Sequence, residues 1–147
     1  MPSVNLGTCC GSSPKDGLQG WLDAGGRGID TAWDYGDQVD INAVLKKNPT
    51  IAREDLFITT KIPAGFGNAT DCSLEHGADI SLGYVQENVR ELGVEYVDLV
   101  LLHAPCLFGE KHNNALWEGL IKARDMNLTR AIGTLCTRLP VAKKTVG

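Results

Sequence analysis

One apolar run limits the fold of this chain more than any other feature of its sequence. Residues 96–103 read YVDLVLLH, with Val or Leu at most positions and no regular alternation with polar residues. An alternating run would indicate a strand with one face in solvent, whereas a continuous run predicts a strand buried on both faces. Such strands are typical of parallel sheets covered by helices, so this run predicts an α/β fold.

Four further apolar runs and four segments with helical periodicity alternate along the chain. The runs that predict strands are residues 4–9, 28–32, 56–61, 96–103 and 129–133. The segments that predict helices are residues 13–25, 40–47, 82–92 and 115–126. Residues 64–79 are rich in glycine and polar side chains, and they predict a long loop before the third helix.

The alternation of strands and helices predicts parallel strands joined by crossover helices. Two architectures share this pattern, a doubly wound sheet and part of a (β/α)8 barrel. A doubly wound nucleotide fold usually carries G-x-G-x-x-G or a phosphate-binding loop after its first strand. Residues 7–11 read GTCCG and match neither motif.

The composition limits the partners and the compartment to expect. The chain has 147 residues, of which 43% are hydrophobic and 22% charged, and its net charge is −4. No basic stripe is present, so we expect no nucleic acid partner. No run approaches the ~20 apolar residues of a membrane span, and no signal peptide pattern is found, which predicts a cytoplasmic protein without a membrane partner.

Cysteine usage predicts reduced thiols. The cysteines are odd in number and lack C-x-x-C spacing, so we expect neither a disulfide framework nor a zinc site. The cysteines are Cys9, Cys10, Cys72, Cys106 and Cys136.

Polar side chains lie at the carboxyl ends of three consecutive predicted strands. Asp30 lies near the end of the second strand, Lys61 ends the third and His103 ends the fourth. Tyr35 follows in the loop after the second strand. The carboxyl ends of barrel strands form the active-site face, so these side chains are expected to converge on one cleft. Each residue alone has a structural explanation, such as a turn, a solvated Lys or a packed Tyr, but three successive strand ends favour a functional one.

Several segments around these residues resemble the aldo-keto reductase family. Residues 26–36 (GRGIDTAWDYG) are similar to its first signature, in which Tyr follows Asp by five residues. Residues 53–61 (REDLFITTK) and 96–105 (YVDLVLLHAP) resemble the segments that end its third and fourth strands. The resemblance implies an α/β fold, a partial (β/α)8 TIM barrel of about five parallel strands and four helices. It covers residues 1–133 and leaves a divergent tail, residues 134–147.

The resemblance implies NAD(P)H-dependent reduction of an aldehyde, ketone or sugar carbonyl to an alcohol by hydride transfer. Its catalytic residues would be Asp30, Tyr35, Lys61 and His103, with Tyr35 as the proton donor. Lys61, held by Asp30, would favour the phenolate form of the tyrosine. His103 would donate to the carbonyl oxygen and orient it. NADPH is the usual cofactor of the family, NADH is not excluded, and no metal is required.

The resemblance also implies contacts to the cofactor and the substrate. Thr8 and Asp30 would contact the cofactor, and His103 would contact the substrate. Trp33 is expected at the cleft mouth, either against the substrate or as a packed loop aromatic. The histidines expected in solvent-exposed loops are His76 and His112.

Part of the family pattern is not found. A complete barrel of this type needs about 250 residues, and the Ser-Asn pair expected after residues 131–133 is replaced by Thr134-Leu135. An open half-barrel exposes two edge strands, so we expect self-association through them. Three explanations stay open: a truncated, catalytically inactive fragment, a non-catalytic interaction protein that binds another chain, and two half-barrels that pair to close a barrel.

Overall fold

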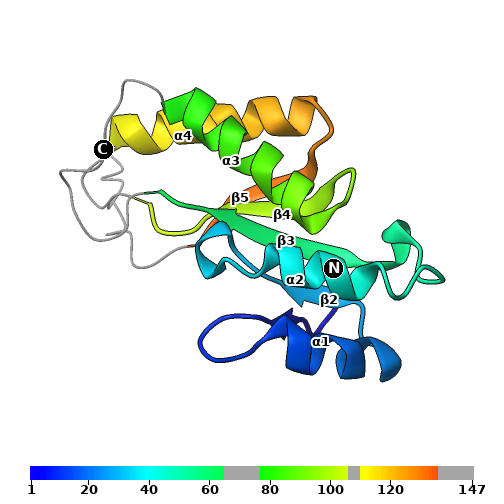
Figure 1. The fold of residues 1–147 in the computed structure, drawn as a ribbon. Helices are drawn as coiled ribbons and strands as arrows, with labels where there is room; N and C mark the ends of the chain where they lie inside the picture. The colour runs from blue at the N-terminus through cyan, green and yellow to red at the C-terminus, as the bar shows by residue number, and fades with distance from the viewer. Residues whose placement is uncertain (65–76, 106–109, 136–147) are drawn as a thin grey trace, which may run out of the picture.

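A five-stranded parallel sheet forms the centre of the molecule (Figure 1). The computed structural model describes residues 1–64, 77–105 and 110–135. Each strand pairs with its neighbours in sequence, so the strand order is β1-β2-β3-β4-β5. The strands are β1 (Leu6–Gly7), β2 (Gly28–Asp30), β3 (Phe57–Ile62), β4 (Val97–Leu102) and β5 (Thr129–Thr134).

The helices form one layer against this sheet. Right-handed crossovers that always step in the same direction place each helix on the same face, and each α-helix contacts the next one in sequence. A doubly wound sheet would reverse direction and carry helices on both faces, so the predicted partial (β/α)8 barrel is confirmed. The α-helices are α1 (Pro14–Asp23), α2 (Gln38–Leu45), α3 (Gly77–Leu92) and α4 (Glu110–Asp125). Two short 3-10 helices are η1 (Trp33–Tyr35) and η2 (Arg53–Asp55).

Helix α1 begins where the sequence predicts. The Ser13 side chain caps it by accepting a hydrogen bond from the Lys15 backbone N–H at 3.2 Å. Pro14 occupies the first turn, where its missing N–H costs nothing. Gly25 then adopts a φ of 87°, a left-handed conformation that ends the helix with little strain.

The strand register separates the sheet into an outer face under the helices and an inner face. Side chains alternate between the faces, and paired residues share a face. One inner row runs across all the strands through Gly7, Asp30, Thr59, Leu99 and Ala131. The next inner row contains Lys61, Leu101 and Gly133. Asp30 and Lys61 therefore share the inner face, while their sequence neighbours Ile29 and Ile62 point to the helices.

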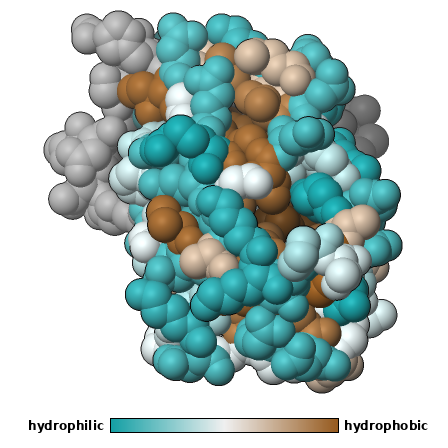
Figure 2. All heavy atoms as spheres, turned by 45° about the vertical axis from the view of Figure 1, so that its right-hand side comes forward, coloured by the Kyte–Doolittle hydropathy of each residue, from teal (hydrophilic) through white to brown (hydrophobic). Residues whose placement is uncertain are grey.

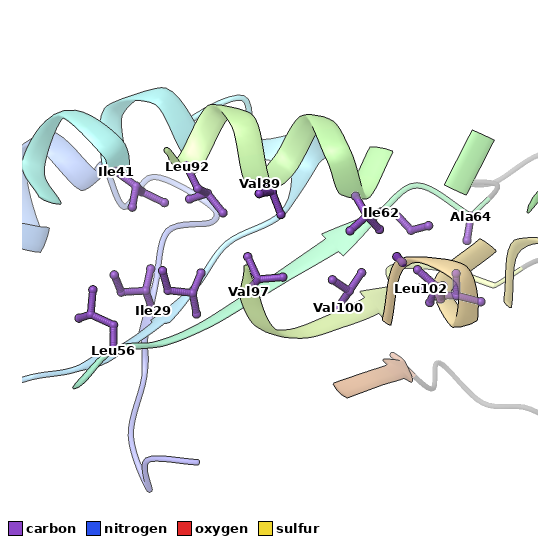
Figure 3. Packing of buried hydrophobic residues seen from close by; sticks show 14 of the residues in the cluster. Ile29, Ile41, Leu56, Ile62, Ala64, Val89, Leu92, Val97, Val100 and Leu102 are labelled. Atoms are coloured by element: carbon purple, nitrogen blue, oxygen red, sulfur yellow. The ribbon is translucent and has the colours of Figure 1, made fainter. Parts of the chain in front are cut away.

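The hydrophobic core lies between the outer face and the helix layer. Figure 3 shows Ile41 of α2 and Val89 and Leu92 of α3 directed toward strand residues such as Ile29 and Val100. Each such side chain contributes roughly 1.5–3 kcal/mol when fully buried. The core therefore fixes the strands from the outer side, so the inner face can carry the polar side chains of Asp30 and Lys61.

The inner face of β4 is less buried than the sequence predicts. Val100 and Leu102 point to the helices and are buried, but Leu99 and Leu101 on the inner face are only half-buried. The prediction of a strand buried on both faces was wrong because the open sheet leaves the inner face of β4 only partly covered. Figure 2 also shows a band of hydrophobic residues that reaches the surface between hydrophilic regions.

Two predicted loop segments are helical. Helix α3 begins at Gly77, within the predicted loop of residues 64–79, and residues 65–76 lie outside the described part. Helix α4 begins at Glu110, so His112 is a helical residue with an exposed fraction of only 8%, and its predicted place in an exposed loop was wrong. The apolar periodicity gave no signal before Ala115, because two asparagines, which are weak helix formers, precede it. His76 lies outside the described residues.

Helices α3 and α4 approach each other at a glycine. A Cβ built on Gly119 would lie 1.8 Å from Ser81 Oγ and 2.2 Å from the carbonyl oxygen of Ala78. Ser81 Oγ also donates a hydrogen bond to the carbonyl of Leu116 at 2.7 Å, so it joins the two helices. Gly119 therefore allows the backbones of the two helices to approach closely, and a larger residue would push the helices apart.

Replacing Gly119 with alanine should lower the free energy of unfolding by about 1–3 kcal/mol, because the methyl group overpacks this contact. The matched control is Gly83→Ala in α3, where a Cβ meets nothing within 4 Å. That change should stabilise the protein by about 1 kcal/mol through helix propensity alone. Urea unfolding of both variants measures the difference, and a Gly119→Ala midpoint at or above the wild-type value would contradict the close contact.

Candidate active site

Three of the predicted site residues meet at one cation. Lys61 Nζ donates to Asp30 Oδ1 at 2.5 Å, to the carbonyl oxygen of Thr31 at 2.8 Å and to Tyr35 Oη at 3.4 Å. The Lys61 side chain is 5% exposed, whereas the Asp30 side chain is 36% exposed. A buried ammonium needs a partner that compensates its lost hydration, and Asp30 supplies it. The three contacts fix the Lys61 Nζ atom beside the phenol oxygen.

The 3-10 helix η1 carries Tyr35 into this position. The backbone N–H of Tyr35 donates to the carbonyl of Ala32 at 3.1 Å, and that of Gly36 donates to the carbonyl of Trp33 at 3.2 Å. Gly36 ends the turn with a φ of 65°, which glycine adopts at low cost. Three residues per turn spread the side chains of η1 in three directions.

Trp33 points away from the Lys61 cluster. Its indole Nε1 donates to Glu87 Oε2 at 2.8 Å, and its ring packs edge-on against Tyr84 with the centroids 4.8 Å apart. Both partners lie in α3. The structure therefore packs the Trp33 side chain against the helix layer, and a contact of Trp33 with substrate stays a prediction.

His103 joins the site from the end of β4. Its ring packs edge-on against Tyr35 with the centroids 5.6 Å apart. Its backbone N–H donates to the carbonyl of Ile62 at 3.0 Å, which continues the β3–β4 ladder by one residue. The four residues expected from the sequence, Asp30, Tyr35, Lys61 and His103, are thus brought together. We name them the proton-relay cluster, after the proton-donor role that the family resemblance implies for Tyr35.

Asp34 is a neighbour of this cluster that the sequence reasoning missed. Its Oδ2 atom lies 3.0 Å from His103 Nδ1. Asp34 stands directly before Tyr35 in η1. A carboxylate inside a candidate catalytic turn is a signal that could have drawn attention to it.

A buried polar network supports the strand that carries Lys61. Thr60 Oγ1 donates to Gln38 Oε1 at 2.9 Å, and Gln38 Nε2 donates to Asn88 Oδ1 at 2.7 Å. Asn88 Nδ2 in turn donates to the carbonyl of Lys61 at 3.4 Å. All three side chains are fully buried. Satisfied buried networks rigidify their surroundings, so this one holds β3 against α2 and α3.

Thr8, which follows β1, contacts the backbone of Asp30. Its backbone N–H donates to the carbonyl of Asp30 at 3.0 Å, and its hydroxyl contacts the same oxygen at 3.4 Å. A cavity of about 280 Å³ opens here between residues 8–14, Tyr35 and the start of α2. Sites for drug-sized ligands span about 300–1,000 Å³, so this cavity lies just below that range.

Cys9 and Cys10 form a disulfide in this loop. The expectation of reduced thiols was wrong for this pair, because the odd number and the missing C-x-x-C spacing argue only against bridges between distant cysteines. The other cysteines, Cys72, Cys106 and Cys136, lie outside the described residues.

The described ranges contain no cluster of three or more His, Cys, Asp or Glu side chains arranged to hold a metal ion. Among the helices of the same ranges, none is long and apolar enough to cross a membrane.

The chain is similar to known aldo-keto reductases. An aldo-keto reductase of Mycolicibacterium vanbaalenii is 33% identical over 135 residues, which cover 90% of this chain and 44% of that protein. One of Mycobacterium ulcerans is 36% identical over the same shares of the two chains. The crystal structure of an aldo-keto reductase of the silkworm, Bombyx mori, complexed with NADPH has a TM-score of 0.75 at 29% identity, over 91% of this chain and 44% of that one.

This chain spans less than half the length of these relatives. The model of the Aldo/keto reductase family matches residues 12–135, which include every member of the proton-relay cluster. Together with the barrel topology, this match establishes that the chain belongs to the aldo/keto reductase family.

Proposed function

We propose that this chain carries the proton-relay part of an NAD(P)H-dependent oxidoreductase that reduces an aldehyde, ketone or sugar carbonyl to an alcohol. The observation that carries the proposal is the position of Lys61 Nζ, 2.5 Å from Asp30 Oδ1 and 3.4 Å from Tyr35 Oη. When bound, a reduced nicotinamide supplies the hydride. The residues of this chain then have to deliver one proton and orient the substrate.

Tyr35 is the proposed proton donor. The alkoxide that forms at the carbonyl oxygen takes the phenol proton, and the resulting phenolate is stabilised by the nearby cation of Lys61. Asp30 holds that cation through the short ion pair and keeps it from solvent. His103 is the proposed orienting group for the carbonyl oxygen, and its ring contact with Tyr35 supports this role.

Thr8 and Asp30 are the proposed contacts to the cofactor. The cavity beside Thr8 and the partly exposed Asp30 carboxylate fit the hydroxyl groups of a nicotinamide ribose. NADPH is the proposed cofactor, with NADH as the alternative that a parallel titration tests. The solved silkworm relative, which was crystallised with NADPH, supports a nicotinamide cofactor. A substrate contact by Trp33 stays a prediction, although its indole packs on α3.

The half-buried inner face supports a second candidate function, a non-catalytic interaction protein. Leu99 and Leu101 line this face, and β1 and β5 end the sheet on its two sides. We therefore also propose that the chain self-associates through these edges. A catalytically inactive fragment is the alternative. We also propose that the protein is cytoplasmic and that residues 134–147 form a divergent tail.

NADPH should bind saturably and quench tryptophan fluorescence, because Trp33 lies in η1, the same turn that carries Tyr35. A titration of the full chain with NADPH, and with NADH in parallel, measures both affinities. Trp33→Phe should keep the binding and lose part of the signal, whereas the matched Trp117→Phe in α4 should keep both. Light scattering on the same samples gives the mass of the binding species. A folded sample that binds neither cofactor at millimolar concentration would leave the interaction protein as the better candidate.

A further inference from the structure

Asp34 and His103 form a carboxylate–imidazole pair beside the proton-relay cluster. The Oδ2 atom of Asp34 lies 3.0 Å from Nδ1 of His103, and the two side chains are 26% and 11% exposed. The pair joins η1 to the end of β4 across the cluster. We propose that Asp34 is a positioning residue that fixes the His103 proton on Nδ1, so that the neutral ring carries no proton on Nε2.

The geometry of η1 directs the Asp34 side chain toward His103. The side chains on both sides of it are held elsewhere, Trp33 by Glu87 in α3 and Tyr35 by Lys61. With three residues per turn, the remaining direction from η1 leads to His103. The pair is therefore set by the same turn that places the phenol.

The chemistry of the contact decides the tautomer. An ionised carboxylate only accepts hydrogen bonds, so the nitrogen that faces it has to donate. A neutral imidazole has one N–H, and the partner of one nitrogen decides where that proton sits. With the proton on Nδ1, the Nε2 atom of His103 can donate a hydrogen bond only when the ring is the doubly protonated imidazolium.

The other described neighbours of His103 leave the Asp34 contact in place. The Tyr35 ring packs against the imidazole in a T-shaped arrangement. Lys61 is paired with Asp30. The carbonyl of Ile62 in the adjacent β3 accepts from the His103 backbone N–H. Asp34 supplies the carboxylate that contacts Nδ1.

The consequence for catalysis rests on the proposed function. If His103 orients a carbonyl by donating from Nε2, that donation needs the imidazolium, so the rate should fall as the pH rises. An asparagine at position 34 can donate its amide N–H to Nδ1. The neutral ring then carries its proton on Nε2 and can donate at high pH.

The tautomer can be measured without any activity. Long-range ¹H–¹⁵N spectra of the full ¹⁵N-labelled chain distinguish a protonated from an unprotonated ring nitrogen, and a His103→Gln variant identifies the His103 signals among the three histidines. We expect the Nδ1–H tautomer in the wild type at high pH and the Nε2–H tautomer in Asp34→Asn. Asp23→Asn, which neutralises an exposed carboxylate in α1, should leave the spectrum of His103 unchanged.

A wild-type His103 in the Nε2–H tautomer would overturn the proposal, whether or not the Asp34→Asn variant folds. The same holds for a folded Asp34→Asn variant whose tautomer is unchanged. Where the chain reduces an aldehyde, the pH profile of kcat/KM adds a second readout, in which Asp34→Asn should keep its rate at pH values where the wild type loses it. A chain that shows the expected tautomers and no reductase activity would refute the proposed function alone.

Discussion

Replacing Tyr35 with phenylalanine is expected to lower the rate of NAD(P)H-dependent aldehyde reduction by about 10²–10⁴-fold, the usual contribution of a positioned general acid. The substitution removes only the hydroxyl, which Lys61 Nζ contacts at 3.4 Å. The Asp30–Lys61 ion pair does not depend on that hydroxyl, so cofactor affinity should change little. The loss should therefore appear in kcat, because a proton donor acts in the transition state rather than in binding.

The control for this variant is Tyr84→Phe. Tyr84 packs its ring on Trp33 in the helix layer and stands outside the proton-relay cluster. That variant should keep the wild-type rate, since the ring contact survives the loss of the hydroxyl. Equal rates for Tyr35→Phe and the wild type would remove Tyr35 from the proposed mechanism.

Replacing Asp98 with alanine should lower the free energy of unfolding by about 3 kcal/mol. Asp98 is 3% exposed, and its Oδ2 atom accepts from Arg53 Nη2 at 2.7 Å and from the backbone N–H of Ile58 at 2.9 Å. Its Oδ1 atom accepts from Arg130 Nη1 at 3.3 Å. Removing one partner of a buried pair costs about 3–5 kcal/mol. The lower end applies because Arg53 is partly exposed and can regain some hydration.

Urea unfolding measures this loss, which is a large share of the about 5–15 kcal/mol that stabilises a typical domain. The matched control is Asp79→Ala, which breaks the exposed contact of Asp79 with Lys122. Exposed pairs contribute about 0–1 kcal/mol, so this variant should unfold near the wild-type midpoint. Similar midpoints for Asp98→Ala and Asp79→Ala would show that the buried carboxylate does not hold the strands together.

The sequence predicted the candidate site residues that lie at the ends of strands. Lys61 and His103 follow from strand direction alone, because parallel strands present their carboxyl ends at one edge. The continuous apolar run of residues 96–103 predicted β4, but its burial on both faces assumed a covered sheet. Leu99 and Leu101 show that a local apolar pattern can predict a strand without predicting its burial. The burial depends on the elements that surround the strand.

The residues that the sequence could not place depend on contacts between distant segments. Nothing near Asp34 in sequence identifies His103 as its partner, 69 residues away. Trp33 was expected either against the substrate or as a packed aromatic, and nothing in the sequence identifies Glu87 and Tyr84 of α3 as the residues it contacts. His112 was expected in a loop, because helix propensity before Ala115 is weak, and its burial in α4 comes from packing in the folded protein.

The strand order has a consequence for how the site forms during protein synthesis. Each strand pairs with the one made just before it, so the sheet can grow in the direction of translation. The proton-relay cluster uses residues 30–103, whereas β5 begins only at Thr129. A nascent chain that has emerged through His103 at the end of β4 already contains every side chain of the cluster, so these four residues can come together before β5 is synthesised.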